Sequence, residues 1–71
     1  MSRVVVIDYT NWKGERSLRR IEPQQMVMGS NEWHPKEQWL LLAWDIAKAS
    51  YRHFAMKDIH MWAYEDERIP E

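Results

Sequence analysis

The chain has 71 residues, of which 45% are hydrophobic and 30% charged, and its formal net charge is −1 at pH 7. This composition is typical of one small globular domain, and the near-neutral charge argues against a bulk electrostatic nucleic-acid binder. The absence of cysteine excludes disulfides and a cysteine-based zinc site, and no apolar run approaches the roughly 20 residues that span a bilayer.

The first predicted element is a strand over residues 3–9, which are β-branched and aromatic and too few for a helix. Asn11 and Gly14 follow it, and both are turn residues. Gly14 suits a position with a positive φ. We therefore expect a tight hairpin with Trp12 near its tip.

A second strand is predicted over about residues 16–28. Leu18 and Ile21 are three residues apart, which breaks strict alternation, so we expect a bulge near residues 19–20 that restores both to one face. Pro23 lacks a backbone donor, so the strand is predicted to be interrupted or to lie at a sheet edge there.

A long loop over residues 30–37 precedes a third predicted strand, residues 38–46. Both faces of this strand are apolar, which predicts that it is central, or that one face meets another chain. The rival is a helix over residues 38–51, since Leu, Ala and Lys are good helix formers and the apolar positions partly fit a 3.6-residue period.

The linker over residues 45–50 is short and polar at both ends, as in a hairpin. It leads to a fourth predicted strand over residues 51–57. A single tight turn at residues 57–59 then precedes a fifth strand over residues 59–64, which alternates again.

The predicted domain covers residues 1–64, and residues 65–71 form an acidic tail that we expect to be mobile. Without the tail the chain holds nine bases and seven acids, which permits a local anion site. The expected core includes four large aromatics: Trp39, Trp44, Phe54 and Trp62.

Several motifs in this order resemble the WYL-domain family. That family has an early strand ending in Tyr, a glycine turn, an Arg four residues before a Pro, a Trp-aromatic-Leu strand and an Arg-x-Phe-x-Leu-x-x-Ile strand. The matching residues are Tyr9, Gly14, Arg19 with Pro23, Trp39-Leu40-Leu41, and Arg52, Phe54, Met56 and Ile59. The resemblance covers roughly residues 3–60 and is greatest to short stand-alone members found in bacterial and phage genomes.

The resemblance implies an all-β, Sm-like or SH3-like barrel of about five antiparallel strands. It also implies a regulatory module that senses nucleic acid or nucleotide-like ligands through basic and aromatic residues. Such domains typically accompany helix-turn-helix DNA-binding domains in bacterial transcription regulators and are linked to phage defence. The chain departs from the family pattern at Leu40, Ala55 and Asp58, which replace an aromatic residue and two arginines.

The candidate ligand-binding residues are Tyr9, Arg19, Arg20, Trp39, Arg52 and Phe54. Arginine offers bidentate donors to phosphate, and an aromatic ring can stack a base. The alternative is that these arginines are solvated charges on a strand face, paired with Glu15, Glu22 or Asp45. Trp12 and Trp33 lie in predicted turns and are candidates for a partner surface or for lids over a barrel end.

Other chemistry has little support in the sequence. The spacings of His34, His53 and His60 match no compact metal-ligand pattern, so no metal or cofactor is expected. No serine has an obvious His/Asp setting and no glycine-rich phosphate loop exists, so we expect no enzyme. The start of the chain lacks a secretory signal, which predicts a cytoplasmic protein without a membrane partner.

Three functional hypotheses remain. The first is a WYL-type module that binds nucleic acid or a nucleotide-like anion. The second is a phage or prophage accessory protein that docks on a host regulator or defence protein through an exposed apolar patch. The third is a homo-oligomeric Sm-like ring in which a neighbour uses an unpaired edge strand.

Overall fold

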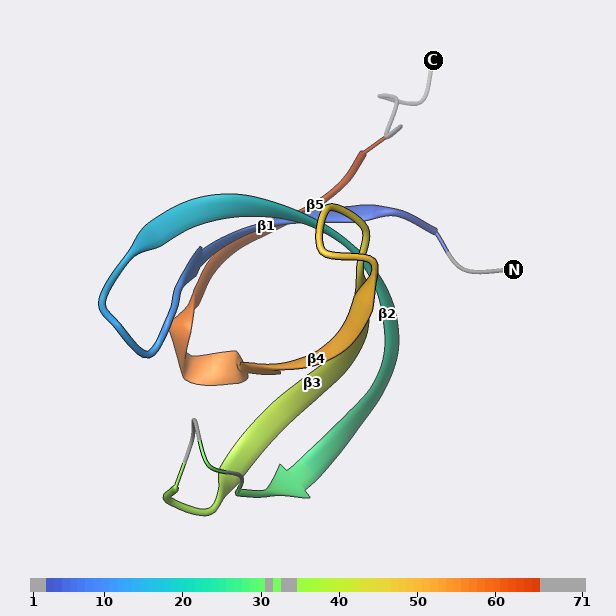
Figure 1. Ribbon diagram of the computed structural model, residues 1–71. Helices are drawn as coiled ribbons and strands as arrows, with labels where there is room; N and C mark the ends of the chain where they lie inside the picture. Colours follow the sequence, from blue (N-terminus) through green and yellow to red (C-terminus); the bar gives the residue numbers. More distant parts are fainter. Residues whose placement is uncertain (1–2, 31, 33–34, 66–71) are drawn as a thin grey trace.

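The computed structural model describes residues 3–30, 32 and 35–65, and these form five antiparallel strands and one turn of 3₁₀-helix. The strands lie in one sheet in the order β4-β3-β2-β1-β5. The sheet curls around its core, with β1, β5 and the first half of β2 on one side and β3 and β4 on the other (Figure 1). The elements are β1 (Val5–Thr10), β2 (Arg16–Gly29), β3 (Gln38–Asp45), β4 (Ser50–Ala55), η1 (Met56–Asp58) and β5 (Ile59–Tyr64).

This architecture confirms the predicted all-β class, with five antiparallel strands in a small barrel-like sheet. The fifth strand has the predicted bounds, and η1 is the tight turn expected before it. Residues 38–45 are a strand, so the rival helix is excluded. Alternating burial along β1 and β3 explains why the period-two pattern outweighed helix propensity.

The long strand β2 joins the two halves of the sheet. Its residues 16–21 pair with β1, whereas its residues 21–29 pair with β3. Pro23 lies beyond Ile21, the last residue of β2 that pairs with β1. Its missing backbone N–H therefore removes no hydrogen bond to β1. The strand is therefore continuous through the proline, and not interrupted there.

The expected bulge near residues 19–20 is wrong. Pairing with β1 runs without a shift from Arg16 to Ile21, and the irregularity falls between Pro23 and Gln25 on the β3 side. Leu18 consequently points to the outer face and is 65% exposed, while Ile21 is fully buried. The sheet bends at the proline instead of at the arginines.

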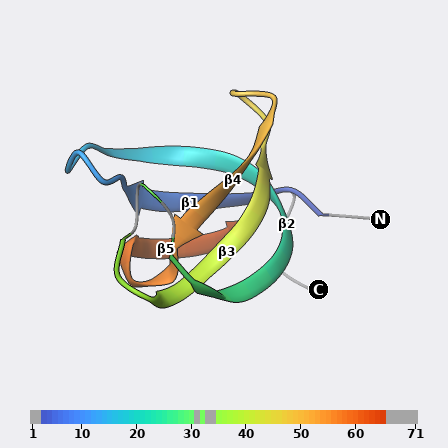
Figure 2. The same cartoon turned by 60° about the horizontal axis from the view of Figure 1, so that its bottom comes forward.

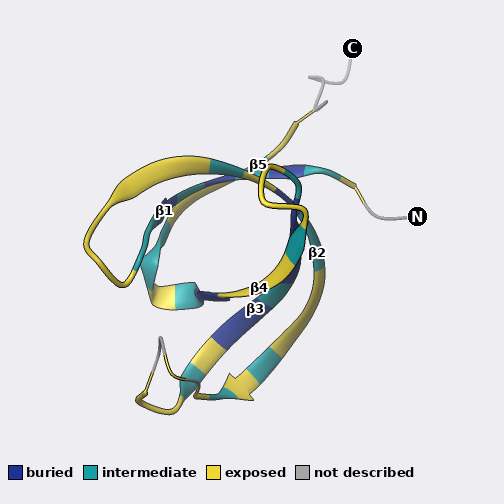
Figure 3. Cartoon of the chain, viewed as in Figure 1, coloured by how far each residue is buried: buried dark blue, intermediate teal, exposed yellow. Residues whose placement is uncertain are grey.

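The core lies between the two halves of the curled sheet (Figure 3). Phe54 packs edge-on against Tyr9 with ring centroids 4.9 Å apart. Met56 and Ile59, from η1 and the start of β5, pack against the cluster. The buried cluster consists of Val5, Ile7, Tyr9, Ile21, Leu41, Ala43 and Phe54.

Two of the four aromatics predicted for the core are exposed. Phe54 is buried and Trp44 is partly buried, but Trp39 is 51% exposed and Trp62 43% exposed. By register both point to the same face as core residues, since Trp62 pairs with Ile7 and Trp39 precedes Leu41 by two. They are exposed because they lie at the ends or edge of the sheet, beyond the opposing half.

Two turns hold the ends of the strands in place. In the β1–β2 hairpin, Gly14 has φ 84°, as predicted, and the Asn11 carboxamide oxygen accepts the backbone N–H groups of Lys13 and Glu15, both at 2.9 Å. In the β3–β4 hairpin, Ala49 adopts φ 50°. The tip of the first hairpin and η1 lie at the same end of the curled sheet (Figures 1 and 2).

Candidate functional site

A pocket of about 350 Å³ opens between the β1–β2 hairpin and β4. Its volume is near the lower end of the range typical of small-molecule sites. Aromatic residues, two arginines, a carboxylate and smaller polar residues meet there. The lining residues are Tyr9, Asn11, Trp12, Arg19, Glu32, Ser50, Tyr51, Arg52, His53 and Phe54.

Four of the six predicted ligand-binding residues lie together in this pocket: Tyr9, Arg19, Arg52 and Phe54. The register explains their convergence. Arg19 pairs with Ile7 and Arg52 pairs with Ala43, and both partners are core residues, so the arginines point to the inner face of the curled sheet. The two strands are not neighbours in the sheet, and only its curvature brings the arginines to one cavity.

Tyr9 and Phe54 form the buried floor of the pocket. The Tyr9 hydroxyl oxygen accepts the backbone N–H of Ala55 at 3.2 Å. Burial raises the pKa of Tyr9 above its ordinary value near 10, so the hydroxyl stays protonated. Within the described residues its own proton has no acceptor, so Tyr9 can donate a hydrogen bond to a ligand.

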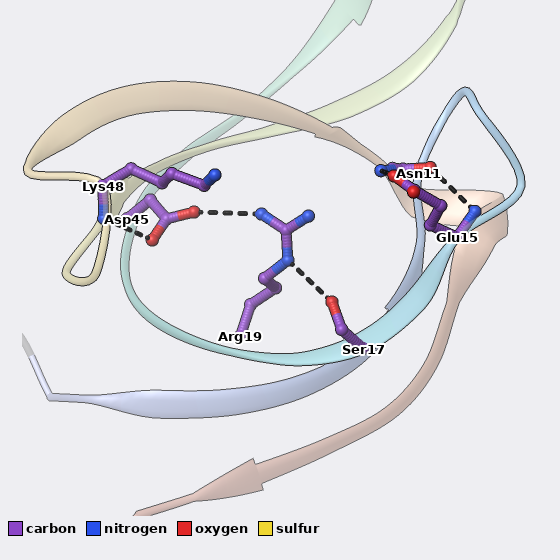
Figure 4. Close-up of polar contacts among 6 residues, drawn as sticks. All are labelled: Asn11, Glu15, Ser17, Arg19, Asp45 and Lys48. Carbon is purple, nitrogen blue, oxygen red and sulfur yellow. Dashed lines mark hydrogen bonds and ion pairs between the residues drawn. The ribbon is translucent and has the colours of Figure 1, made fainter.

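Arg19 is held on two sides (Figure 4). Its Nε donates to Ser17 Oγ at 3.0 Å, and its Nη1 donates to Asp45 Oδ2 at 3.2 Å. The Asp45 carboxylate is only 1% exposed, and its other oxygen accepts the backbone N–H of Lys48 at 3.2 Å. Arg19 therefore presents a fixed guanidinium to the pocket, although its charge already has a counterion.

Arg52 is different, because its side chain is exposed and makes no ion pair or hydrogen bond within the part of the chain that the structure describes. It stands on β4, an edge strand. A guanidinium without an internal counterion, at the rim of a pocket with a polar donor at its floor, is suited to an incoming anion.

The backbone of β4 also contributes to the pocket. The N–H of Ala55 points away from β3, toward Tyr9. Because backbone groups alternate sides along an antiparallel strand, those of Tyr51 and His53 face the same unpaired side. Both residues line the pocket, which thus offers main-chain donors and acceptors as well as side chains.

The other two predicted ligand-binding residues lie elsewhere. Arg20 points to the outer face, where its Nη2 donates to Glu65 Oε2 at 3.0 Å, and this bond raises the pKa of Arg20. Trp39 lies at the far end of β3, beyond the core. Of the two predicted surface tryptophans, Trp12 lines the pocket, and Trp33 is outside the described residues.

Sequence reasoning did not single out Tyr51 or Glu32 as site residues, and it named Asp45 only as a possible partner of the arginines. Tyr51 could have been found as an aromatic directly beside Arg52 on a predicted strand. Asp45 is one of three candidate acids in the sequence, and no sequence pattern indicates that, among the acids of the described residues, this is the buried one. Glu32 reaches the pocket from the long loop, and no local pattern predicts where such a loop lies.

The residues described contain neither a cluster of metal-ligand side chains nor a helix that could cross a membrane. No group of three or more His, Cys, Asp or Glu side chains among them could hold a metal ion; His34 lies outside them. His60 is engaged on the outer face, where its Nε2 lies 2.7 Å from the Thr10 hydroxyl. In residues 3–30, 32 and 35–65 there is also no helix with the length and apolarity to span a bilayer.

The comparisons with known proteins give one family. No curated protein matches the chain. A model of the WYL domain matches residues 1–63, which is most of the 71-residue chain and includes all of the strands except the last residue of β5. This match agrees with the order of motifs from Tyr9 to Ile59, and the chain belongs to the WYL domain family.

Proposed function

We propose that this chain is a non-enzymatic binding module that recognises nucleic acid or a nucleotide-like anion in the pocket between the β1–β2 hairpin and β4. WYL domains are regulatory, ligand-binding modules that are generally without catalytic activity. The observation that carries the proposal is Arg52, a pocket cation that has no counterion within residues 3–30, 32 and 35–65, beside Arg19 and an aromatic floor.

The pocket matches the two parts of a nucleotide. Arg52, Arg19 and the Tyr9 hydroxyl supply donors for phosphate oxygens. Trp12 lines the pocket and is an aromatic side chain that a base can contact there. The Tyr51 ring instead packs edge-on against Trp44, on the face of β4 opposite to Arg52. Each stacked base contributes about 1–3 kcal/mol, so one base and one phosphate together give a measurable affinity.

The test is a titration with single-stranded oligonucleotides and dinucleotides, followed by intrinsic tryptophan fluorescence, since Trp12 lies in the pocket. Wild type should bind at low salt, and affinity should fall as salt rises because phosphate contacts release counterions. Arg19→Ala and Arg52→Ala should each lose most of the affinity.

Arg16→Ala and Arg20→Ala are matched controls, because each removes an exposed arginine from the outer face of β2. Both should retain binding. Loss of binding with Arg20→Ala and not with Arg52→Ala would move the site to the outer face.

A second candidate is a protein-interaction module, for example one that docks on a host regulator. Met26, Met28 and Trp39 are each about half exposed on one face of the β2–β3 ladder. Methionine-rich surfaces adapt to varied partners, and tryptophan is common at interface centres. Failure of every oligonucleotide and nucleotide to bind would favour this candidate.

A further inference from the structure

The charges around the pocket are nearly balanced before any ligand arrives. Within the described residues the lining carries two arginines, Arg19 and Arg52, and one carboxylate, Glu32. Directly behind the lining, Asp45 forms an ion pair with Arg19. Two positive charges are therefore offset by two negative ones, and His53 adds no charge when neutral.

The Arg19–Asp45 pair is not free to open for a ligand. Asp45 is buried, and its two oxygens are occupied by Arg19 and the Lys48 N–H. The Arg19 side chain is itself only 18% exposed and is held at Nε by Ser17. Separating the pair would leave a carboxylate buried without a counterion, which is strongly unfavourable. A ligand can thus accept hydrogen bonds from the remaining N–H groups of Arg19, but the positive charge of Arg19 is already largely offset by Asp45.

Glu32 opposes the binding of an anion, because it places a negative charge at the pocket. Its carboxylate is exposed and lines the cavity that the anion must enter. After one negative charge of a ligand has paired with Arg52, each further negative charge gains little from that arginine. The Glu32 carboxylate lines the same small pocket and repels these further charges, because salt screens charges that lie close together only in part. Lys48 extends over Asp45 (Figure 4), but it does not line the pocket.

Building on the proposed function, we infer that the pocket selects a phosphate group with a single negative charge, as in a phosphodiester next to a planar base, and rejects di- and triphosphates. Among the described residues that line the pocket, Arg52 is the cation without a counterion, and Glu32 sets the limit on charge. The same chemistry occurs within a single-stranded nucleic acid and in a free dinucleotide.

The experiment compares ligands that share the base and differ in charge: the dinucleotide TpT, thymidine monophosphate and thymidine triphosphate, without divalent cations at low salt. Wild type should bind TpT about tenfold or more tightly than the triphosphate. Triphosphate binding as tight as that of TpT would overturn the inference and leave the proposed function standing. Failure of all three ligands and of oligothymidylate to bind would overturn both.

Glu32→Gln identifies the cause of the selectivity. This variant should raise the affinity for the triphosphate several-fold more than the affinity for TpT, because it removes repulsion that grows with ligand charge. Glu37→Gln is the matched control, since Glu37 is an exposed acid of the same loop that does not line the pocket. An equal effect of both variants would assign the selectivity to net charge and contradict a role for Glu32.

An eight-residue oligothymidylate distinguishes the two sources of the ligand. If it binds much more tightly than its number of overlapping dinucleotide sites explains, the occupant is a nucleic-acid strand. If the affinities agree after that correction, the occupant is a small dinucleotide. Both results fit a singly charged phosphate in the pocket.

Discussion

At the scale of single residues, Gly14 and Gly29 form a natural comparison. A Cβ built at either position meets nothing within 4 Å, but only Gly14 has a positive φ. Gly14→Ala should therefore reduce the free energy of unfolding by about 1 kcal/mol, because an L-residue is strained in the left-handed region. Gly29→Ala should cause no loss. Urea unfolding of the two variants measures this, and equal effects would contradict the role of φ.

The buried hydroxyl of Tyr9 gives a pH dependence. Burial raises the folded-state pKa of Tyr9, so the folded protein keeps a proton that the unfolded chain loses near pH 10. The stability that the protonated Tyr9 hydroxyl contributes is fully present below pH 10 and declines as pH rises through the folded-state pKa. The unfolding free energy should thus fall above pH 10, and less so in Tyr9→Phe.

At neutral pH, Tyr9→Phe should cost about 1–3 kcal/mol, because it leaves the buried Ala55 N–H without an acceptor. Tyr51→Phe is the control, since Tyr51 is exposed. It should have little effect at pH 7 and leave the alkaline decline unchanged. Denaturant titrations at pH 7 and above pH 10 separate the two effects.

At the scale of elements, the register of β2 decides which apolar residue matters. Ile21→Val, which removes one methylene from the core, should cost about 0.5–1.5 kcal/mol. Leu18→Ala removes more of the side chain but should change stability by no more than about 0.5 kcal/mol, because Leu18 is exposed on the outer face. A larger loss of unfolding free energy in Leu18→Ala would instead support the bulge near residues 19–20 that the sequence predicted.

The same strand shows what a sequence can and cannot predict. Alternation and turn residues sufficed for β1, the Gly14 turn and β5, since these depend on neighbours along the chain. The position of the bulge did not follow, because Pro23 lies where β2 changes partner, and that depends on how far β1 extends. The prediction that Trp39 and Trp62 belong to the core was wrong for a related reason. Both side chains face inward, but they lie where the opposite half of the sheet no longer covers them.

The candidate site depends on the curvature of the whole sheet. Arg19 and Arg52 are both candidates through the family resemblance, but nothing in their spacing shows that two non-adjacent strands meet. Asp45 was one of three acids that the sequence offered as partners of the arginines, but its burial and the reach of Glu32 were not predictable, because both depend on where a hairpin and a long loop lie in three dimensions. Four of the six candidate residues line one pocket, but the net charge of that pocket did not follow from the sequence.

At the scale of the whole molecule, a 71-residue chain has a thin stability margin, so ligand binding should appear directly in the melting temperature. A ligand at 100 times its Kd adds about 2.7 kcal/mol. In a domain of this size each kcal/mol raises Tm by roughly 4–8 °C. An oligothymidylate at that concentration should therefore raise the Tm of wild type by about 10 °C or more.

The two pocket arginines should then separate stability from binding. Arg52→Ala should leave the Tm of the free protein nearly unchanged, because Arg52 is exposed and makes no ion pair among the described residues, but it should abolish most of the ligand-induced rise. Arg19→Ala should lower both, because it leaves the Asp45 carboxylate buried without its counterion, a loss of about 3–5 kcal/mol for fully buried pairs. Thermal melts with and without the oligonucleotide measure both effects. If Arg52→Ala melts several degrees lower without ligand, Arg52 stabilises the fold. If the variant keeps the full ligand-induced rise in Tm, the anion binds elsewhere.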